Sequence, residues 1–319
     1  METYYYTPQF IQVKNMNNKL SIIIPSYNEF SNTIKIINNI FETCSHKDNI
    51  EIIVVNDNSN ENYSKLSTNN AIKYIANPNN LGTSQSRDIG IKMVDNEYIL
   101  TIDSHMIFYK KYWDKEIIET IKNNNKSILC FPVIDIANSK VYYAGGFHLL
   151  NLKNIELSLS PFLLNKEPNE EEIPCVVGGA YAFNKNFYNH LNGMEGMVGW
   201  GVGETFLSIK SYLAGGNCKL IKNVKIGHSF EKGNYTINKK YVYYNKLFLS
   251  QTILPLELSS ILLNLLPQNK EKEDAIQLFK QNSKEIFRNR IMYENIFNTP
   301  FADYVKKFNL DKNDKIIKN

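Results

Sequence analysis

Residues 98–105 read Tyr-Ile-Leu-Thr-Ile-Asp-Ser-His, a short apolar run that ends in Asp103, Ser104 and His105. The apolar run predicts a buried strand, and the polar tripeptide predicts the loop that follows it. Asp103 and His105 are two positions apart, so in extended backbone their side chains project to the same side. A carboxylate oxygen and an imidazole nitrogen together suit Mn²⁺ well and Mg²⁺ less well. The alternative is a strand-end Asp that caps the next turn, beside an incidental His.

Similar apolar runs lie on the N-terminal side of this stretch. Leu20–Ile24 ends in Pro25, Ile50–Val55 ends in the cluster 56–59, and a third run covers 71–76. Apolar residues at helical spacing predict helices over 29–44 and 83–94, between the runs. This alternation predicts an α/β fold, with a mostly parallel sheet flanked by helices on both faces. Ligands of such sheets bind beyond the carboxyl ends of the strands, so the clusters 25–29, 56–59 and 103–105 predict one shared crevice.

The second half of the chain has a different pattern. Strands are expected within 130–147, 176–183 and 218–222, with a more polar connection over 151–172. A helix over 204–213 is expected to stop at Gly215-Gly216. Beyond 233 helical patterns dominate, for example over 272–287 and 291–308. We therefore expect a leader at 1–18, a catalytic domain at 19–233 and a helical C-terminal extension at 234–319.

Composition narrows the function classes. The 36 basic and 32 acidic residues give a net charge of +4. This near balance gives no reason to expect nucleic-acid binding, which usually uses a concentrated basic patch. Four widely spaced cysteines predict separate thiols in a reducing compartment, and hence a cytoplasmic protein. The N-terminus lacks the pattern of a signal peptide. The most apolar window, 247–266, contains polar residues and Pro255, so a buried or amphipathic helix is expected rather than a transmembrane segment. The Lys-rich C-terminal part would allow weak attraction to a membrane surface.

His228 is a second candidate metal ligand. It is one of five histidines and lies in the stretch Ile226-Gly227-His228-Ser229, after an expected strand and before a Gly-bounded loop. A lone His at such a place is more often a surface or core residue, so its weight depends on the motifs around it.

Taken in order, the motifs resemble those of the GT-A nucleotide-sugar glycosyltransferases of the family-2-like group. The resemblance covers roughly residues 18–232 and is greatest to polypeptide N-acetylgalactosaminyltransferases and related bacterial enzymes. The stretches that carry it are Ser21–Glu29, Ile52–Ser59, Asn80–Arg87, Asp103-Ser104-His105, Gly178-Gly179-Ala180, Gly196-Met197 followed by Trp200-Gly201, and Gly227-His228. Asp103-Ser104-His105 resembles the Asp-x-His form of the family's metal motif, and Gly227-His228 its third ligand position.

The resemblance implies a Rossmann-like GT-A fold, a UDP-sugar donor and a bacterial source. It implies a Mn²⁺ or Mg²⁺ ion held by Asp103, His105 and His228. The residues implied to bind the donor or the ion–diphosphate complex are Pro25, Tyr27, Glu29, Asp57, Arg87, Asp103, Ser104, Gly178 and Gly179. Arg87 would bring a positive charge towards the nucleotide; otherwise it would form a helix-surface ion pair with Asp88 or Asp95.

Glu204 and Trp200 are the implied catalytic residues. The stretch is Trp200-Gly201-Val202-Gly203-Glu204-Thr205. Aligned to the family without a gap, Glu204 takes the position of the general base of inverting enzymes, and Lys210 matches a basic residue six positions on. With a gap, Thr205 would replace an Asn of the retaining polypeptide transferases. We expect inversion of the configuration at the anomeric carbon, with retention as the alternative.

The sequence therefore predicts transfer of a hexose or N-acetylhexosamine from a UDP-sugar to a saccharide, peptide or lipid-linked acceptor. A nucleotidyltransferase would need a Gly-rich basic loop near the first strand, and 25–29 lacks one. A catalytically dead sugar-nucleotide-binding protein has no reason to keep Asp103, His105, His228 and Glu204 together. The donor sugar, the acceptor and the oligomeric state are left open.

Overall fold

The computed structural model describes residues 19–68, 71–140, 142–150, 157–163, 171–230, 237–308 and 310. The predicted leader, 1–18, lies outside the described residues. The predicted boundary between catalytic domain and extension, at 233/234, also falls outside them and stays a prediction.

The main sheet has eight strands in the order β10-β12-β6-β11-β4-β1-β2-β3. Their bounds are β1 Leu20–Ser26, β2 Ile50–Asn56, β3 Ile72–Ala76, β4 Tyr98–Ile102, β6 Ser127–Cys130, β10 Glu172–Ile173, β11 Ala180–Asn184 and β12 Asn217–Leu220. β3, β2, β1 and β4 are parallel neighbours, and β12 is parallel to β6. β11 runs antiparallel between β4 and β6, and β10 is antiparallel to β12. The mostly parallel α/β sheet is confirmed.

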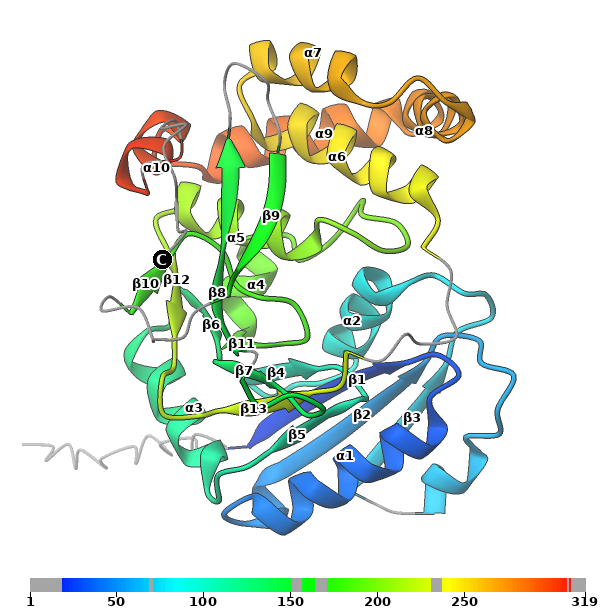
Figure 1. Ribbon diagram of the computed structural model, residues 1–319, viewed down its shortest axis with the longest axis vertical. Helices are drawn as coiled ribbons and strands as arrows, with labels where there is room; N and C mark the ends of the chain where they lie inside the picture. Colours follow the sequence, from blue (N-terminus) through cyan, green and yellow to red (C-terminus); the bar gives the residue numbers. More distant parts are fainter. Residues whose placement is uncertain are drawn as a thin grey trace, which may run out of the picture.

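Helices cover both faces of this sheet (Figure 1). Because successive residues of a strand point to opposite faces, neighbouring residues of β1 enter different cores. Ile22 packs in a core with helices α1 (Phe30–Thr43) and α3 (Trp113–Asn123). Ile23 packs in the other core, with α2 (Thr83–Lys92), α4 (Lys185–His190) and α5 (Gly203–Leu213). The carboxyl ends of β4, β1 and β2 thereby meet at one edge.

A second sheet, in the order β5-β13-β7-β8-β9, lies beside the first. Its strands are β5 Met106–Phe108, β7 Val133–Asp135, β8 Tyr142–Leu150, β9 Leu157–Leu163 and β13 Ile226–His228. β5 and β13 are antiparallel, with His228 opposite Met106, and the Ser229 N–H donates to the His105 carbonyl at 3.1 Å. This pairing joins two histidines that are far apart in the sequence.

The structure divides the strand region expected over 130–147 and adds a strand to the connection expected over 151–172. The expected strand region 130–147 contains the end of β6, then β7 and most of β8, in two different sheets, and Pro132 lies at the first break. Proline lacks the N–H that a continuous central strand would use, which explains this break. The connection expected over 151–172 contains β9, in which Leu157-Ser158-Leu159-Ser160 has the period of a strand.

The C-terminal part is helical, as predicted, but its helices are shorter than expected. They are α6 Lys239–Ile253, α7 Leu256–Leu265, α8 Lys270–Gln281, α9 Ser283–Ile296 and α10 Phe301–Lys307. The apolar window 247–266 is divided at Pro255, and the helix expected over 291–308 is divided before Pro300. Both breaks follow from the restriction that proline places on the residue before it. The helix expected over 272–287 ends instead at Asn282, which lies between α8 and α9.

Two features bear on the cellular compartment of the protein: the state of the cysteines and the length of the apolar helices. Cys44, Cys130, Cys175 and Cys218 are buried free thiols, as expected, and a cytoplasmic location remains a prediction. Among the described residues, the longest apolar helices fall short of what a membrane crossing requires.

The C-terminal helices share one hydrophobic core with the sheet. Tyr244, Phe248 and Tyr293 pack in the same cluster as Ile23 and Phe206. Lys210 of α5 is fully buried at this junction. Its ammonium group donates to the carbonyls of Leu191 (2.8 Å) and Gly193 and to the Tyr293 hydroxyl (3.2 Å). Lys210 therefore ties α5 to α9.

Replacing Lys210 tests this junction. Lys210→Met keeps most of the side-chain volume but leaves two carbonyls and a hydroxyl without their donor. We expect a loss of roughly 2–4 kcal/mol in the free energy of unfolding, measured by urea denaturation. Lys280→Met, on the exposed surface of α8, is the matched control. Equal stability of the two variants would contradict a stabilising role for Lys210.

Candidate active site

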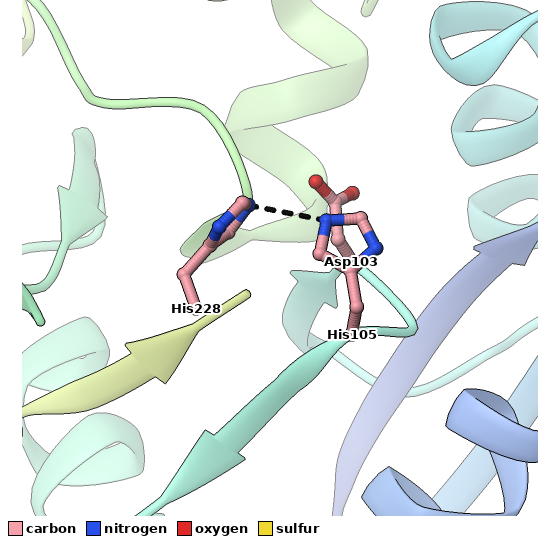
Figure 2. Close-up of side chains that lie close together, drawn as sticks. All are labelled: Asp103, His105 and His228. Carbon is pink, nitrogen blue, oxygen red and sulfur yellow. Dashed lines mark hydrogen bonds between the residues drawn. The ribbon is translucent and has the colours of Figure 1, made fainter. Parts of the chain in front are cut away.

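Three side chains converge where the two sheets meet. Asp103 follows β4, His105 precedes β5, and His228 ends β13, and Figure 2 shows them pointing towards one another. One ligand atom from each lies within 4.8 Å of the other two. The Nε2 atoms of His105 and His228 are 3.2 Å apart. One carboxylate and two imidazoles of this spacing form a donor set for a divalent cation.

Glu29 fixes the orientation of His105. Its Oε2 accepts a hydrogen bond from the Ser104 hydroxyl and lies 2.9 Å from His105 Nδ1. A carboxylate behind a ligand histidine holds Nδ1–H and aims the Nε2 lone pair outward, as in many metal sites. Here Nε2 faces His228, so the arrangement fits a metal bound at that side. Glu29 thus lies behind the predicted metal ligand His105, and its predicted part in donor binding remains a prediction.

The two imidazoles differ in charge preference. Burial opposes protonation of His105, but the hydrogen bond that His105 donates to Glu29 and the negative charges of Asp103 and Glu29 raise its pKa. Burial, and then the charge of His105, lower the pKa of His228 to about 4. His228 Nδ1 is buried, with no hydrogen-bond partner among the described residues. His228 is thus a neutral imidazole near pH 7, which is the form that binds metals.

Arg87 of α2 lies beside this group and is only 3% exposed. Its Nη2 donates to Asp103 Oδ1 and its Nη1 to Glu204 Oε1, both at 2.8 Å. Nη1 also donates to the Tyr181 hydroxyl at 3.1 Å, and the guanidinium lies 5.0 Å from the Tyr181 ring centroid. Neither surface ion pair considered for Arg87, with Asp88 or with Asp95, is formed. The guanidinium instead joins a predicted metal ligand to the predicted base.

Glu204 and the paired glycines lie next to each other. Glu204 is in the first turn of α5, and a Cβ at Gly178 would come within 3.3 Å of its Oε1. Gly179 has φ +98°, and its carbonyl accepts from the Asp103 N–H at 2.7 Å. A Cβ there would lie 3.3 Å from the His228 ring. The glycine pair therefore keeps side chains out of the space between Glu204 and the group of Asp103, His105 and His228.

Asp57, predicted to recognise the nucleotide, has structural partners. It is 4% exposed, and its carboxylate accepts from the N–H groups of Leu81 (2.8 Å) and Gly82 (2.7 Å). It also accepts from the Asn77 side chain at 2.8 Å. These bonds shape the turn that starts α2 and so help to position Arg87. Nucleotide recognition by Asp57 remains a prediction.

The remaining predicted residues surround the same edge. Pro25 is buried within β1 opposite Val55, and Tyr27 follows the strand half-buried. Trp200 is 48% exposed in the loop before α5. Tyr181 was missed by the sequence analysis, although its place two residues after Gly178-Gly179 could have indicated it. Tyr181 lies in β11, and its neighbour in that strand, Ala180, pairs with Ile102, the residue before Asp103.

Residues 21–191, just over half of the chain, match the family described as glycosyl transferase family 2. Polypeptide N-acetylgalactosaminyltransferase 11 of Xenopus tropicalis is 25% identical over 235 residues, which are 66% of this chain and 38% of that protein. The human polypeptide N-acetylgalactosaminyltransferase 14 is 26% identical over 227 residues, 66% of this chain and 41% of the relative. The chain thus spans less than half the length of these relatives.

Two solved structures share the fold. A crystal structure of GalNAc-T7 with UDP, GalNAc and Mn²⁺ matches 93% of this chain and 57% of its own, with a TM-score of 0.70 and 17% identity. The structure of S. aureus TarS 1–349 in complex with UDP-GlcNAc matches 92% of this chain and 88% of its own, with a TM-score of 0.54 and 14% identity. Both likenesses bear on the fold alone.

The buried Arg87 makes a stability prediction. Arg87→Met leaves the carboxylates of Asp103 and Glu204 close together without their shared cation. We expect the free energy of unfolding to fall by about 3–5 kcal/mol, measured by guanidinium denaturation. Arg288→Met removes an arginine that is 71% exposed in its pair with Glu195, and should change stability little. A similarly small effect of Arg87→Met would be inconsistent with the bridging role.

Proposed function

Because the chain belongs to glycosyl transferase family 2, we propose that it transfers a hexose or N-acetylhexosamine from a UDP-sugar to an acceptor hydroxyl. The observation that carries this proposal is the convergence of Asp103, His105 and His228 within 4.8 Å, beside the Arg87–Glu204 pair. The ligands named for the two similar structures, UDP with GalNAc and Mn²⁺, and UDP-GlcNAc, support this class of donor.

Mn²⁺ is the proposed cofactor, with Mg²⁺ as the weaker alternative, held by Asp103, His105 and His228. When bound, such an ion neutralises the charge that develops on a departing diphosphate. The protein's own part is to hold the ligands ready. Glu29 orients His105, and Arg87 restrains Asp103 through its Oδ1. Gly178 and Gly179 leave room beside these ligands for the donor sugar.

Glu204 is the proposed general base, which takes a proton from the acceptor hydroxyl as that oxygen attacks the anomeric carbon. Its Oε1 is held by Arg87 at 2.8 Å, so the carboxylate is fixed in direction. Gly203 precedes it at the start of α5, where a Cβ would lie 2.9 Å from the Ser84 hydroxyl. We adopt the ungapped alignment, in which Gly203 replaces the family's Glu and Glu204 is the base. Attack by the acceptor oxygen on the face of the anomeric carbon opposite the diphosphate inverts the configuration of that carbon.

The acceptor is proposed to approach past Trp200, which is half-exposed in the loop that leads into α5. A saccharide, a peptide or a lipid-linked sugar would each supply the hydroxyl. The names of the polypeptide N-acetylgalactosaminyltransferases favour peptides among these classes.

Binding of UDP tests the metal site without requiring an acceptor. We expect UDP to bind more tightly with Mn²⁺ than with EDTA, measured by isothermal titration calorimetry. His105→Ala should remove the Mn²⁺-dependent gain because it deletes one of three ligands. His190→Ala, at the exposed end of α4, should leave it intact. UDP affinity that is equal in Mn²⁺ and EDTA would count against the metal site.

The base is tested by Glu204→Gln. Release of UDP from UDP-GalNAc and UDP-GlcNAc should slow by about 10²–10⁴-fold, because the amide cannot accept the proton. Glu195→Gln, on a half-exposed surface residue, is the control. NMR of the wild-type product before mutarotation should give the β-anomer from the α-linked donor. An α-anomer would overturn inversion and favour the retaining alternative, and no turnover of any UDP-sugar would favour a binding protein.

A further inference from the structure

Helix α6 of the C-terminal extension covers the loop of residues 196–202, which leads into α5. Three glycines of this loop meet one face of the helix. A Cβ at Gly196 would lie 2.1 Å from Phe248, one at Gly199 would lie 2.6 Å from Tyr241, and one at Gly201 would lie 3.2 Å from Val242. A side chain at Gly196 or Gly199 would displace the aromatic ring it meets, and both glycines have positive φ (+87° and +58°), so the loop backbone itself packs on α6.

Asn245 fixes this contact. It is fully buried and lies on the same helical face, four residues after Tyr241 and three before Phe248. Its side-chain oxygen accepts from the Val198 N–H at 2.9 Å. Its amide nitrogen donates to the carbonyls of Val198 (2.8 Å) and Gly201 (3.0 Å). One side chain of the extension thus makes three hydrogen bonds to the loop backbone.

The loop is strained at its end. Val202 has φ +53° and caps α5 directly before Gly203 and Glu204. A β-branched residue is a genuine outlier in this region, and such conformations persist where surrounding contacts hold them. The carbonyl of Gly201, which precedes Val202, is one of the groups held by Asn245. The hydrogen bond from Asn245 to Gly201 therefore acts directly beside Val202, the residue that caps the start of α5.

We propose that α6 is a positioning element of the active site, and that Asn245 is the positioning residue that holds the loop carrying Trp200 and the first turn carrying Glu204. Asn245 acts through the loop backbone. In its catalytic consequence this inference rests on the proposed function, since it takes Glu204 as the base. It gives the extension a direct part in the transfer reaction.

The test compares Asn245→Ala and Tyr241→Ala with a matched control, Asn289→Ala. Tyr241 is only half-buried, so its truncation should leave the fold intact even where loss of Asn245 does not. Asn289 is 2% exposed in α9 and bonds to Asn192, away from the loop. The control therefore removes a similarly buried amide from the extension without touching residues 196–202.

Three measurements separate positioning from general instability. Iodide quenching of tryptophan fluorescence reports on Trp200, because the other of the two tryptophans, Trp113, is fully buried. Calorimetry of UDP with Mn²⁺ reports on the metal site, and UDP release from UDP-GalNAc and UDP-GlcNAc reports on turnover. All use the full chain.

Both loop variants should raise the quenching constant by about two-fold or more, because a released loop exposes Trp200. Turnover should fall by roughly 10- to 100-fold, with the Mn²⁺–UDP affinity unchanged, and Asn289→Ala should match wild type in all three. Quenching equal to wild type in both loop variants, or unchanged turnover with a released loop, would overturn the proposal. A wild type that turns over no UDP-sugar would refute the proposed function and the catalytic part of this inference, whereas quenching would still decide whether α6 holds the loop.

Discussion

The buried guanidinium of Arg87 is the constraint on which the site depends. A charge that is 3% exposed must be paired, and Arg87 meets this requirement with Asp103 from the end of β4 and Glu204 from the start of α5. The two carboxylates are thereby fixed relative to each other, although 101 positions of the chain separate them. Any displacement of either one would leave a charge without its partner in a poorly solvated place. The geometry between Asp103 and Glu204 is thus set within the folded protein, and preorganisation of this kind is how active sites avoid reorganisation during reaction.

The contacts that position Arg87 extend from helix α2 to other elements of the fold. Asp57 fixes the turn that begins α2, and Gly82 in that turn contacts the backbone of Gly199. Gly199 belongs to the loop that α6 holds, so β2, α2 and α6 form one continuous set of contacts around the site. Glu29, between β1 and α1, likewise holds His105 in its orientation. The functional side chains are therefore held by elements of both sheets and of the C-terminal helices together.

Much of the fold followed from local pattern. The strands around Asp103 are apolar runs that end in polar clusters, and their alternation with helices predicted a mostly parallel sheet with helices on both faces. The group of Asp103, His105 and His228 also followed, because Asp103 and His105 are two positions apart and the family motif supplied His228. These features depend on neighbours in sequence, which a single chain displays.

The features that were missed depend on contacts between distant residues. Arg87 gave no sign that it would be buried between two carboxylates, and Asn245 lies in a helix whose pattern resembles any other amphipathic segment. The division of 130–147 between two sheets is decided by which strands find partners, not by the apolar run itself. Likewise, Asp57 looked like a ligand residue by motif, and only the positions of Leu81 and Gly82 revealed its structural bonds.

The glycines under α6 bear on how this protein could diversify. A loop that packs by its backbone has no side chains on that face with which to adapt to a new helix, so its shape is complementary to one helix surface only. Residues 196–202 and 239–253 must then change together. A chimera that receives the loop of a relative without the matching helix would lose the complementarity, whereas exchange of both segments would preserve it. The shape of this loop is therefore a property of two segments that lie more than thirty positions apart in the chain.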